Sequence, residues 1–327
     1  MQYDENFEVC LGKTVMDSDL LGCYDRSDPV FHYTSPNGLL GILRENGPVL
    51  WFSQYDSLND ISEGIHIVEV YQRVCKELFA ANKIDSDFCH AIYDVKPITK
   101  EMFLYNLKED GTPNNLTDYC KFEEVQKYVC CFSKNQDSLP MWNYYAKGDK
   151  YEGYNIGFCF WRTRQWDVQD CYGKGYNFEL FTVIYDDNTK REIVQKKIKE
   201  LYSYYRDADC IETREKILPR IKTTLSYYLK ALGLKFKQDC FQHEQEVRAI
   251  LTVPKGNTKF KVKYRSKAGY IIPYIEIPFP AQIISSITVG PLLNDQSAVE
   301  NIKQFTRDRH YLLNDNDIQT SKIPIRY

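Results

Sequence analysis

The sequence lacks both a long apolar run and an excess of charge of either sign. No apolar segment approaches the length needed to span a bilayer, and the acidic first residues, MQYDENFEVCLGK, lack a signal-peptide core. The 42 basic residues are balanced by 45 acidic residues, which gives a net charge of −3. These absences predict a cytoplasmic protein that is not a globally basic nucleic-acid binder, although a local basic groove is compatible with them.

Several cofactor and catalytic motifs are also missing. There is no G-x-G-x-x-G and no P-loop, so neither a Rossmann fold nor a Walker-type ATPase is indicated, and no G-x-S-x-G marks a serine hydrolase. The 11 cysteines are odd in number and include no C-x-x-C, while Cys240 and His243 form a lone C-x-x-H without a second pair at ligand spacing. We therefore expect reduced, mostly buried cysteines and no metal site.

The order of apolar segments predicts an α+β fold, because short strands do not alternate regularly with helices. The expected strands cover residues 29–33, 49–53, 128–133, 153–161, 178–186, 244–253, 270–279 and 283–290, with a further edge strand in SKIPIRY at 321–327. Helices are expected after the N-cap Ser35 and Pro36, over about 62–82, within 188–232, and in SAVENIKQFTRDR. We expect one domain with a polar leader (1–28) and helical insertions at about 83–127 and 188–233.

The strongest chemical signal is the segment QHEQEVRAIL. If residues 244–251 form a strand, its period of two places Glu244, Glu246 and Arg248 on one face and Val247 and Ala249 on the other. Such a face is often plain solvated surface with an internal ion pair. Alternatively, two carboxylates beside a guanidinium can bind sugar hydroxyls or stabilise developing positive charge.

A second candidate is the acidic loop DSLNDISEG, which contains Asp56, Asn59, Asp60 and Glu63. These side chains could ligate Mg²⁺ or Ca²⁺, but the spacing is not that of an EF-hand and no matching acidic motif occurs elsewhere. A turn with acids at the positive end of a helix dipole is the favoured interpretation, and direct contact with a ligand is a third.

Two aromatic-rich segments are ambiguous on pattern alone. In CFSKNQDSLPMWNYYA, aromatics at helical spacing such as Trp142 and Tyr145 usually belong to a core, whereas Ser133 ends a strand before a polar loop, as in many binding sites. His32 and Tyr33 lie just before the helix cap, and capping alone does not explain them.

Taken in order, these segments resemble a large bacterial family of unknown function. Its signature comprises H-Y-T-S before a GLLGIL-type helix, an N-D-P-x-E-G loop, C-F-S with M-W-x-x-Y-A, an E-x-E-[FWY]-R strand and an I-x-x-[IV]-x-x-G-P strand. The matching residues here are His32–Ser35, Asn59–Gly64, Cys131–Ser133, Met141–Ala146, Glu244–Arg248 and Ile287–Pro291. Three positions depart from the pattern: Ile61 replaces the usual proline, Cys240 or Phe241 stands near the tryptophan that usually precedes the E-x-E pair, and Val247 replaces an aromatic residue. These are differences of packing.

This layout is in turn similar to ADP-ribosyltransferases, especially the DNA-targeting toxins and the RNA 2′-phosphotransferases, which also open with an H-x-T strand and end in a strand glutamate. The resemblance implies split antiparallel sheets and NAD as a substrate. In it, His32 would donate to a ribose hydroxyl, and Glu246 would bond the ribose 2′-OH and stabilise an oxocarbenium-like transition state. Glu244 would orient or deprotonate the acceptor, and Trp142 or Tyr145 would stack on nicotinamide. The residues implied to bind NAD are His32, Tyr33 (through its backbone), Thr34, Asn59, Ser133, Trp142, Tyr145 and Arg248.

The expected function is therefore an NAD-dependent ADP-ribosyltransferase, acting as an intracellular toxin or phage-defence effector on RNA or DNA. Lys235-Phe236-Lys237 is a hint of a phosphate contact. The alternatives are a protein acceptor, an NAD glycohydrolase using the same site, a non-enzymatic binding module, and a metal-dependent nuclease built on Asp56, Asp60 and Glu63. A toxin would require an antitoxin as a partner, and no membrane partner is expected.

Overall fold

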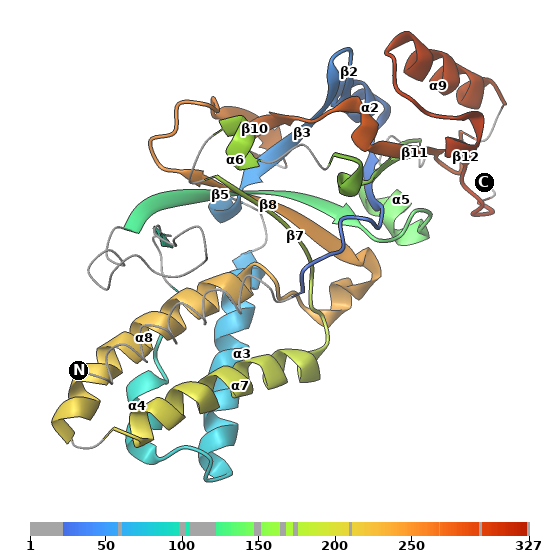
Figure 1. The fold of residues 1–327 in the computed structure, drawn as a ribbon. Helices are drawn as coiled ribbons and strands as arrows, with labels where there is room; N and C mark the ends of the chain where they lie inside the picture. The colour runs from blue at the N-terminus through green and yellow to red at the C-terminus, as the bar shows by residue number, and fades with distance from the viewer. Residues whose placement is uncertain are drawn as a thin grey trace. The chain divides into compact units, whose positions relative to one another are not determined.

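The computed structural model describes residues 22–57, 61–97, 102–104, 122–146, 152–163, 168–172, 176–208, 211–267, 269–293 and 296–325. It shows an α+β protein with a mixed, mostly antiparallel sheet, which confirms the expected fold class (Figure 1). The chain divides into two compact units. We call residues 24–58, 126–182 and 242–327 the sheet unit, and residues 59–125 and 183–241 the helical unit.

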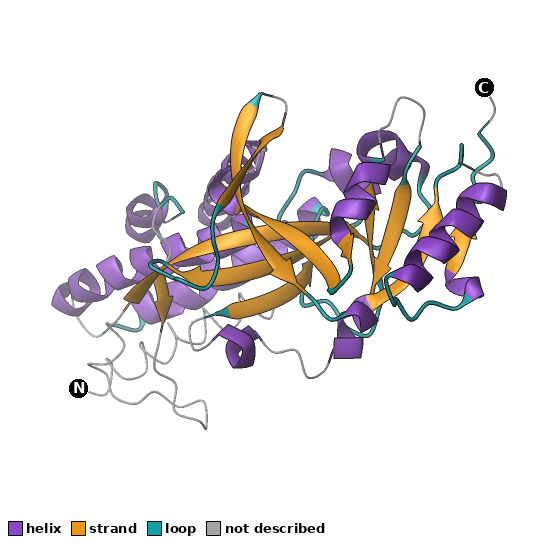
Figure 2. Ribbon diagram, turned by 90° about the horizontal axis from the view of Figure 1, so that it is seen from above, coloured by secondary structure: helices purple, strands orange, loops and turns teal. Residues whose placement is uncertain are grey.

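The sheet unit follows the strand order β12-β11-β6-β1-β5-β3-β10-β9, while β8 pairs with β5 and with β7, and β2 pairs with β3 (orange in Figure 2). Only β11 and β12 are parallel among the pairs whose register is assigned in the described residues. The strands are β1 (Val30–Thr34), β2 (Leu43–Arg44), β3 (Gly47–Gln54), β5 (Phe122–Ser133), β6 (Tyr154–Phe158), β7 (Asn177–Thr182), β8 (Glu246–Pro254), β9 (Lys263–Lys267), β10 (Tyr270–Pro278), β11 (Ile284–Val289) and β12 (Ile318–Thr320).

Alternate residues of these strands separate the core of the sheet unit from its other face. Tyr128, Cys130 and Phe132 of β5 point into the core, where they join apolar residues of β3, β8 and β10. The period of two therefore places Val129, Cys131 and Ser133 on the opposite face of β5. That second face carries most of the polar residues singled out from the sequence.

In the described residues, the helices of the sheet unit are α2 (Pro36–Ile42), α5 (Leu139–Tyr145), α6 (Val168–Tyr172) and α9 (Gln296–Asp308). The predicted cap of α2 is confirmed, because Ser35 Oγ accepts from the Gly38 N–H at 3.1 Å and Pro36 opens the helix. Ser138 likewise precedes α5, but its side chain makes no capping bond.

The helical unit contains α3 (Ile61–Ala80), α4 (Ser86–Ile92), α7 (Asp187–Arg206) and α8 (Ile211–Gly233), together with the short strand β4 (Met102–Leu104), which pairs with the first residues of β5. The long helix predicted near 62–82 is confirmed, and the helical block at 188–232 forms two helices. Their apolar stripes build a separate core, which includes Tyr71, Phe88, Ile198 and Leu229.

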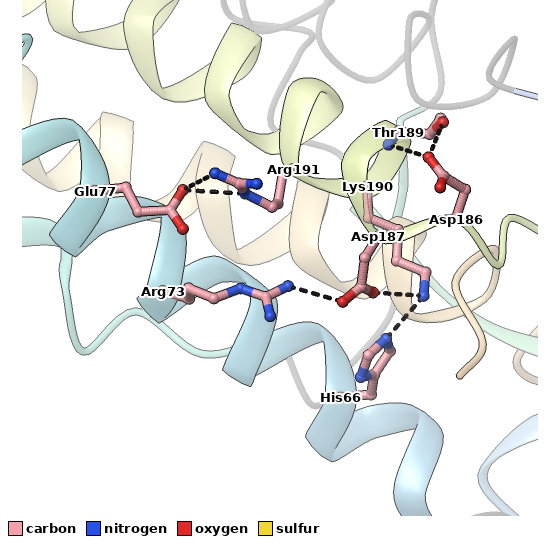
Figure 3. Close-up of polar contacts among 8 residues, drawn as sticks. All are labelled: His66, Arg73, Glu77, Asp186, Asp187, Thr189, Lys190 and Arg191. Carbon is pink, nitrogen blue, oxygen red and sulfur yellow. Dashed lines mark hydrogen bonds and ion pairs between the residues drawn. The ribbon is translucent and has the colours of Figure 1, made fainter. Parts of the chain in front are cut away.

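Polar contacts join α3 to α7 within this unit, made by His66, Arg73, Glu77, Asp187, Lys190 and Arg191 (Figure 3). The fully buried ammonium of Lys190 lies 3.1 Å from His66 Nε2 and 3.2 Å from Asp187 Oδ1. Because an ammonium can only donate, His66 accepts through Nε2 and keeps its proton on Nδ1. Burial and the charge of Lys190 lower the pKa of His66 below 6.5.

The His66 contact predicts a loss of stability in mild acid. The neutral ring is favoured in the folded state, so its contribution is fully present above pH 6.5 and is lost as the pH falls through the lowered pKa. Urea unfolding between pH 7.5 and 5.5 should show wild-type stability falling more steeply than that of His66→Gln. Parallel pH profiles for the two proteins would contradict this assignment.

Some sequence expectations were wrong in position. Residues 321–325 of SKIPIRY form no strand, and the edge strand lies just before them, in β12. Lys235 and Lys237 are buried, so they offer no exposed phosphate contact. Across the described residues, no helix combines the length and apolar character needed to cross a membrane.

Candidate active site

The site begins with a buried ion pair at the start of β8. Arg248 Nε donates to Glu246 Oε1 at 2.9 Å and its NH2 group donates to Oε2 at 3.2 Å. Glu246 is 4% exposed and Arg248 is 2% exposed. The predicted alternation holds here, since Val247 and Ala249 lie in the core. The guanidinium thus fixes the orientation of the Glu246 carboxylate.

Glu244 does not share this strand geometry, contrary to the prediction of a strand over 244–251. It ends a 3₁₀ helix, η4 (Asp239–Glu244), and β8 starts only at Glu246. Gln245 between them has a φ of 42°, in the left-handed region. This left-handed residue puts a kink between η4 and β8. Two hydrogen bonds hold the kink: Ser133 Oγ donates to the Glu244 carbonyl at 2.7 Å, and the Lys134 N–H donates to the Gln245 carbonyl at 2.9 Å.

The side chain of Glu244 is tied to α5. Tyr145, the last residue of that helix, donates its hydroxyl to Glu244 Oε1 at 2.9 Å. Glu244 is buried, whereas Tyr145 is 45% exposed. The two acids therefore have different partners, one a buried cation and the other a tyrosine that reaches the surface.

Cys131 of β5 connects the acids to β1. Although Cys131 is exposed, desolvation by the surrounding protein, the charge of Glu246 and a hydrogen bond to its carboxylate raise the pKa of the thiol well above its usual value. The carbonyl of Cys131 accepts from His32 Nδ1 at 3.1 Å. Sequence analysis treated Cys131 as a packing residue, and only its position beside Glu246 marks it as part of the site.

The assigned register between β1 and β5 covers only the pair Phe31 and Ser133. Beyond it, the His32 ring bonds the backbone of β5 at Cys131. This ring is partly buried and lies edge-on to Phe132 at 5.8 Å. Burial and the charge of Arg265 lower the pKa of His32, although its bond to Cys131 opposes this. The ring is therefore neutral near pH 7, with its proton on Nδ1, and among the described residues Nε2 has no hydrogen-bond partner.

Tyr33 and Trp142 hold the loop between β5 and α5. The Tyr33 hydroxyl donates to the Asn135 carbonyl at 2.8 Å and accepts from the Ser138 N–H at 3.0 Å. Trp142 is fully buried, packs edge-on against Tyr33 at 4.8 Å, and donates its indole N–H to Asp137 at 2.7 Å. These contacts position the loop, whereas Tyr145, which bonds Glu244, and the neighbouring Tyr144 are both exposed.

Thr34, the last residue of β1, packs closely against Gly153, and a substitution of that glycine tests the packing. A Cβ on Gly153 would lie 2.7 Å from the Thr34 carbonyl and 2.6 Å from Ala146 Cβ. Gly153→Ala should therefore lower the free energy of unfolding by about 1–3 kcal/mol. Gly41→Ala is the matched control, because a Cβ there meets nothing within 4 Å and should stabilise α2 by about 0.5–1 kcal/mol. Equal effects of the two changes in denaturant unfolding would contradict the crowding.

The acidic loop cannot be placed in this site. Asn59 and Asp60 lie outside the described residues, as does the side chain of Glu63. Within the described residues, no group of three or more His, Cys, Asp or Glu side chains is arranged to hold a metal ion.

The site therefore belongs to an α+β protein in which buried acids lie at the start of β8, and His32 of β1 is linked to them through Cys131, whose carbonyl accepts from the His32 ring. Residues 141–249 match a family described as a protein of unknown function, DUF2971. The matched segment includes Trp142, Tyr145, Glu244, Glu246 and Arg248, but not His32. No curated protein and no solved structure gives a significant match to the chain.

Proposed function

We propose that the protein is an NAD-dependent ADP-ribosyltransferase that uses the Glu244–Glu246 pair and His32, with a nucleic acid as acceptor. The observation that carries the proposal is the pair of buried carboxylates with unlike partners, Arg248 for Glu246 and Tyr145 for Glu244. Two acids in different environments suit two different tasks in glycosyl transfer.

Glu246 is suited to stabilising the transition state. Arg248 fixes its orientation, yet a carboxylate has more lone pairs than the guanidinium uses, so it can still accept from a ribose 2′-OH. As the bond between nicotinamide and C1′ breaks, its electron pair leaves with nicotinamide. The positive charge that develops on the ribose then lies close to a preorganised negative charge.

Glu244 is suited to the acceptor. Its contact with the partly exposed Tyr145 links one carboxylate oxygen to a side chain that reaches the surface, which would suit contact with a second substrate. The acceptor atom would bond to C1′ and lose its proton to Glu244. Tyr145, rather than the buried Trp142, offers a ring on which nicotinamide could stack.

His32 would bind a ribose hydroxyl as an acceptor rather than as a donor. Its Nδ1–H is already donated to Cys131, and its lowered pKa disfavours a second proton. The available Nε2 lone pair can therefore receive a hydrogen bond from a sugar hydroxyl.

The proposal is tested by incubating the full chain with adenylate-labelled NAD and separate pools of RNA, DNA and protein. Nicotinamide release with transfer of label to a nucleic acid is the expected result. Release without transfer to any pool would show an NAD glycohydrolase, and transfer to protein alone would show a different acceptor. No release under any condition would refute the NAD chemistry.

A further inference from the structure

One stretch of the chain is strongly basic, although basic and acidic residues are nearly equal in number over the whole sequence. Residues 255–267 contain Lys255, Lys259, Lys261, Lys263, Arg265 and Lys267, and no acidic residue occurs before Glu276. The stretch runs into β9 and forms a hairpin with β10, at the end of the strand order. We call residues 255–278 the basic hairpin.

The register of the hairpin places these cations among aromatic rings. Tyr274 of β10 pairs with Lys263 of β9 on one side and with Ser53 of β3 on the other. Two residues further along β10, Glu276 pairs with Trp51 of β3. Because paired residues share a face and alternate residues return to it, Lys263 and Arg265 lie on the face that also carries Trp51 and Tyr274. Cationic and aromatic side chains therefore alternate across three strands.

Arg265 and Trp51 form the centre of this face. The guanidinium lies 6.0 Å from the centroid of the Trp51 ring and donates to Ser53 Oγ at 2.8 Å. The Trp51 ring also packs on Tyr274, with centroids 4.6 Å apart, yet it remains 40% exposed. A large aromatic ring that is held by a neighbouring ring, is partly exposed and lies beside a cation is a surface on which a planar base can stack.

The positive charge of the hairpin is only partly neutralised. Arg44 and Lys263 share the single carboxylate of Glu276, at 3.1 Å and 2.8 Å. The exposed Lys259 and Lys261 form no ion pair within the part of the chain that the structure describes. The Nε of Arg265 is buried there without a hydrogen-bond partner, so the available positive charge comes from the exposed lysines. The surface thus keeps cations available for an anionic ligand.

This face continues toward the candidate active site. Ser53 pairs with Val129 of β5, and two residues further along β5 lies Cys131, whose thiol contacts Glu246. Glu246 and Arg248 of β8, which pairs with β5, lie on the same side as Cys131. The face that carries Trp51 and Arg265 therefore extends toward the acids.

We propose that the basic hairpin binds single-stranded nucleic acid, with phosphates on its exposed lysines and a base stacked on Trp51. Lysines on an edge strand also prevent strand-to-strand aggregation, but that role does not need an exposed tryptophan beside an arginine. A single strand fits better than a duplex, because only unpaired bases present their faces for stacking. Its role as the acceptor strand rests on the proposed function, whereas binding itself does not.

The test is fluorescence anisotropy with labelled 20-nucleotide RNA and DNA single strands, using the full chain without NAD over a range of salt concentrations. The double variant Lys259→Gln/Lys261→Gln should bind about tenfold more weakly, with a salt slope smaller by about 1.4, since each phosphate contact on a single strand contributes about 0.7. Trp51→Ala should bind the strands about tenfold more weakly, and Trp51→Phe should recover part of the lost affinity.

Lys196→Gln/Lys199→Gln is the matched control, because it removes the same charge from exposed positions of α7. It should bind like the wild type. Comparing the RNA and DNA arms identifies the preferred strand. The proposal is overturned if neither strand binds, if the control loses as much affinity as the hairpin variant, or if anionic vesicles or polyglutamate compete as well as nucleic acid. Binding without NAD consumption would refute the proposed function alone.

Discussion

Replacing Arg248 with methionine is expected to lower the free energy of unfolding by about 3–5 kcal/mol. The substitution keeps an unbranched apolar stem but leaves the Glu246 carboxylate, which is 4% exposed, without its cation. A buried charge without a partner keeps its full desolvation cost. At acidic pH, where the carboxyl can take up a proton, the deficit should shrink.

Chemical denaturation of Arg248→Met and of Glu246→Met/Arg248→Met separates this cost from lost packing. The double variant removes both charges, so it should recover most of the stability that the single variant loses. If the double variant is as unstable as Arg248→Met, the deficit comes from packing around residue 248 rather than from the uncompensated carboxylate.

Glu246→Gln is expected to reduce nicotinamide release from NAD by about 10²–10³-fold. Glutamine keeps the shape of the side chain and one acceptor oxygen for Arg248, but it carries no negative charge to stabilise an oxocarbenium-like ribose. The rate should be measured at saturating NAD, so that the loss reports on the chemical step rather than on binding.

The stability of each variant must be measured alongside its activity, because Glu246→Gln also leaves Arg248 without an anion. Glu246→Met/Arg248→Met provides the control, since it should fold better than Glu246→Gln while still lacking the carboxylate. Recovery of activity in that double variant would show that Glu246 acts only through folding, and would transfer the catalytic role to Glu244.

Long helices and buried strands were predictable because their patterns are local. Residues 61–80 and 187–233 repeat apolar residues at helical spacing, and 128–133 is an apolar run bounded by polar residues. The strand β9 was missed, although KVKYRSK alternates at the period of a strand. Lysine is depleted in strands, so the alternation was obscured by composition.

The site was predictable in its residue types but not in its geometry. The segment QHEQEVRAIL pointed to Glu246 and Arg248, and their pairing on one face follows from strand alternation. The left-handed Gln245 could not be predicted, because bonds from Ser133 and Lys134, more than 100 residues earlier, hold it in place. For the same reason, the sequence did not show that Trp142 is buried while Tyr145 is exposed.

The kink at Gln245 has a mechanical consequence for the two acids. Glu246 is clamped within its own strand by Arg248, whereas Glu244 is attached through Tyr145 to the end of α5. A shift of α5 would therefore pull on Glu244 and leave Glu246 where it is. Glu246 therefore stays fixed in its strand while Glu244 follows the end of α5. Under the proposed function, an event at the end of α5 would change acceptor activation without changing the charge beside the ribose.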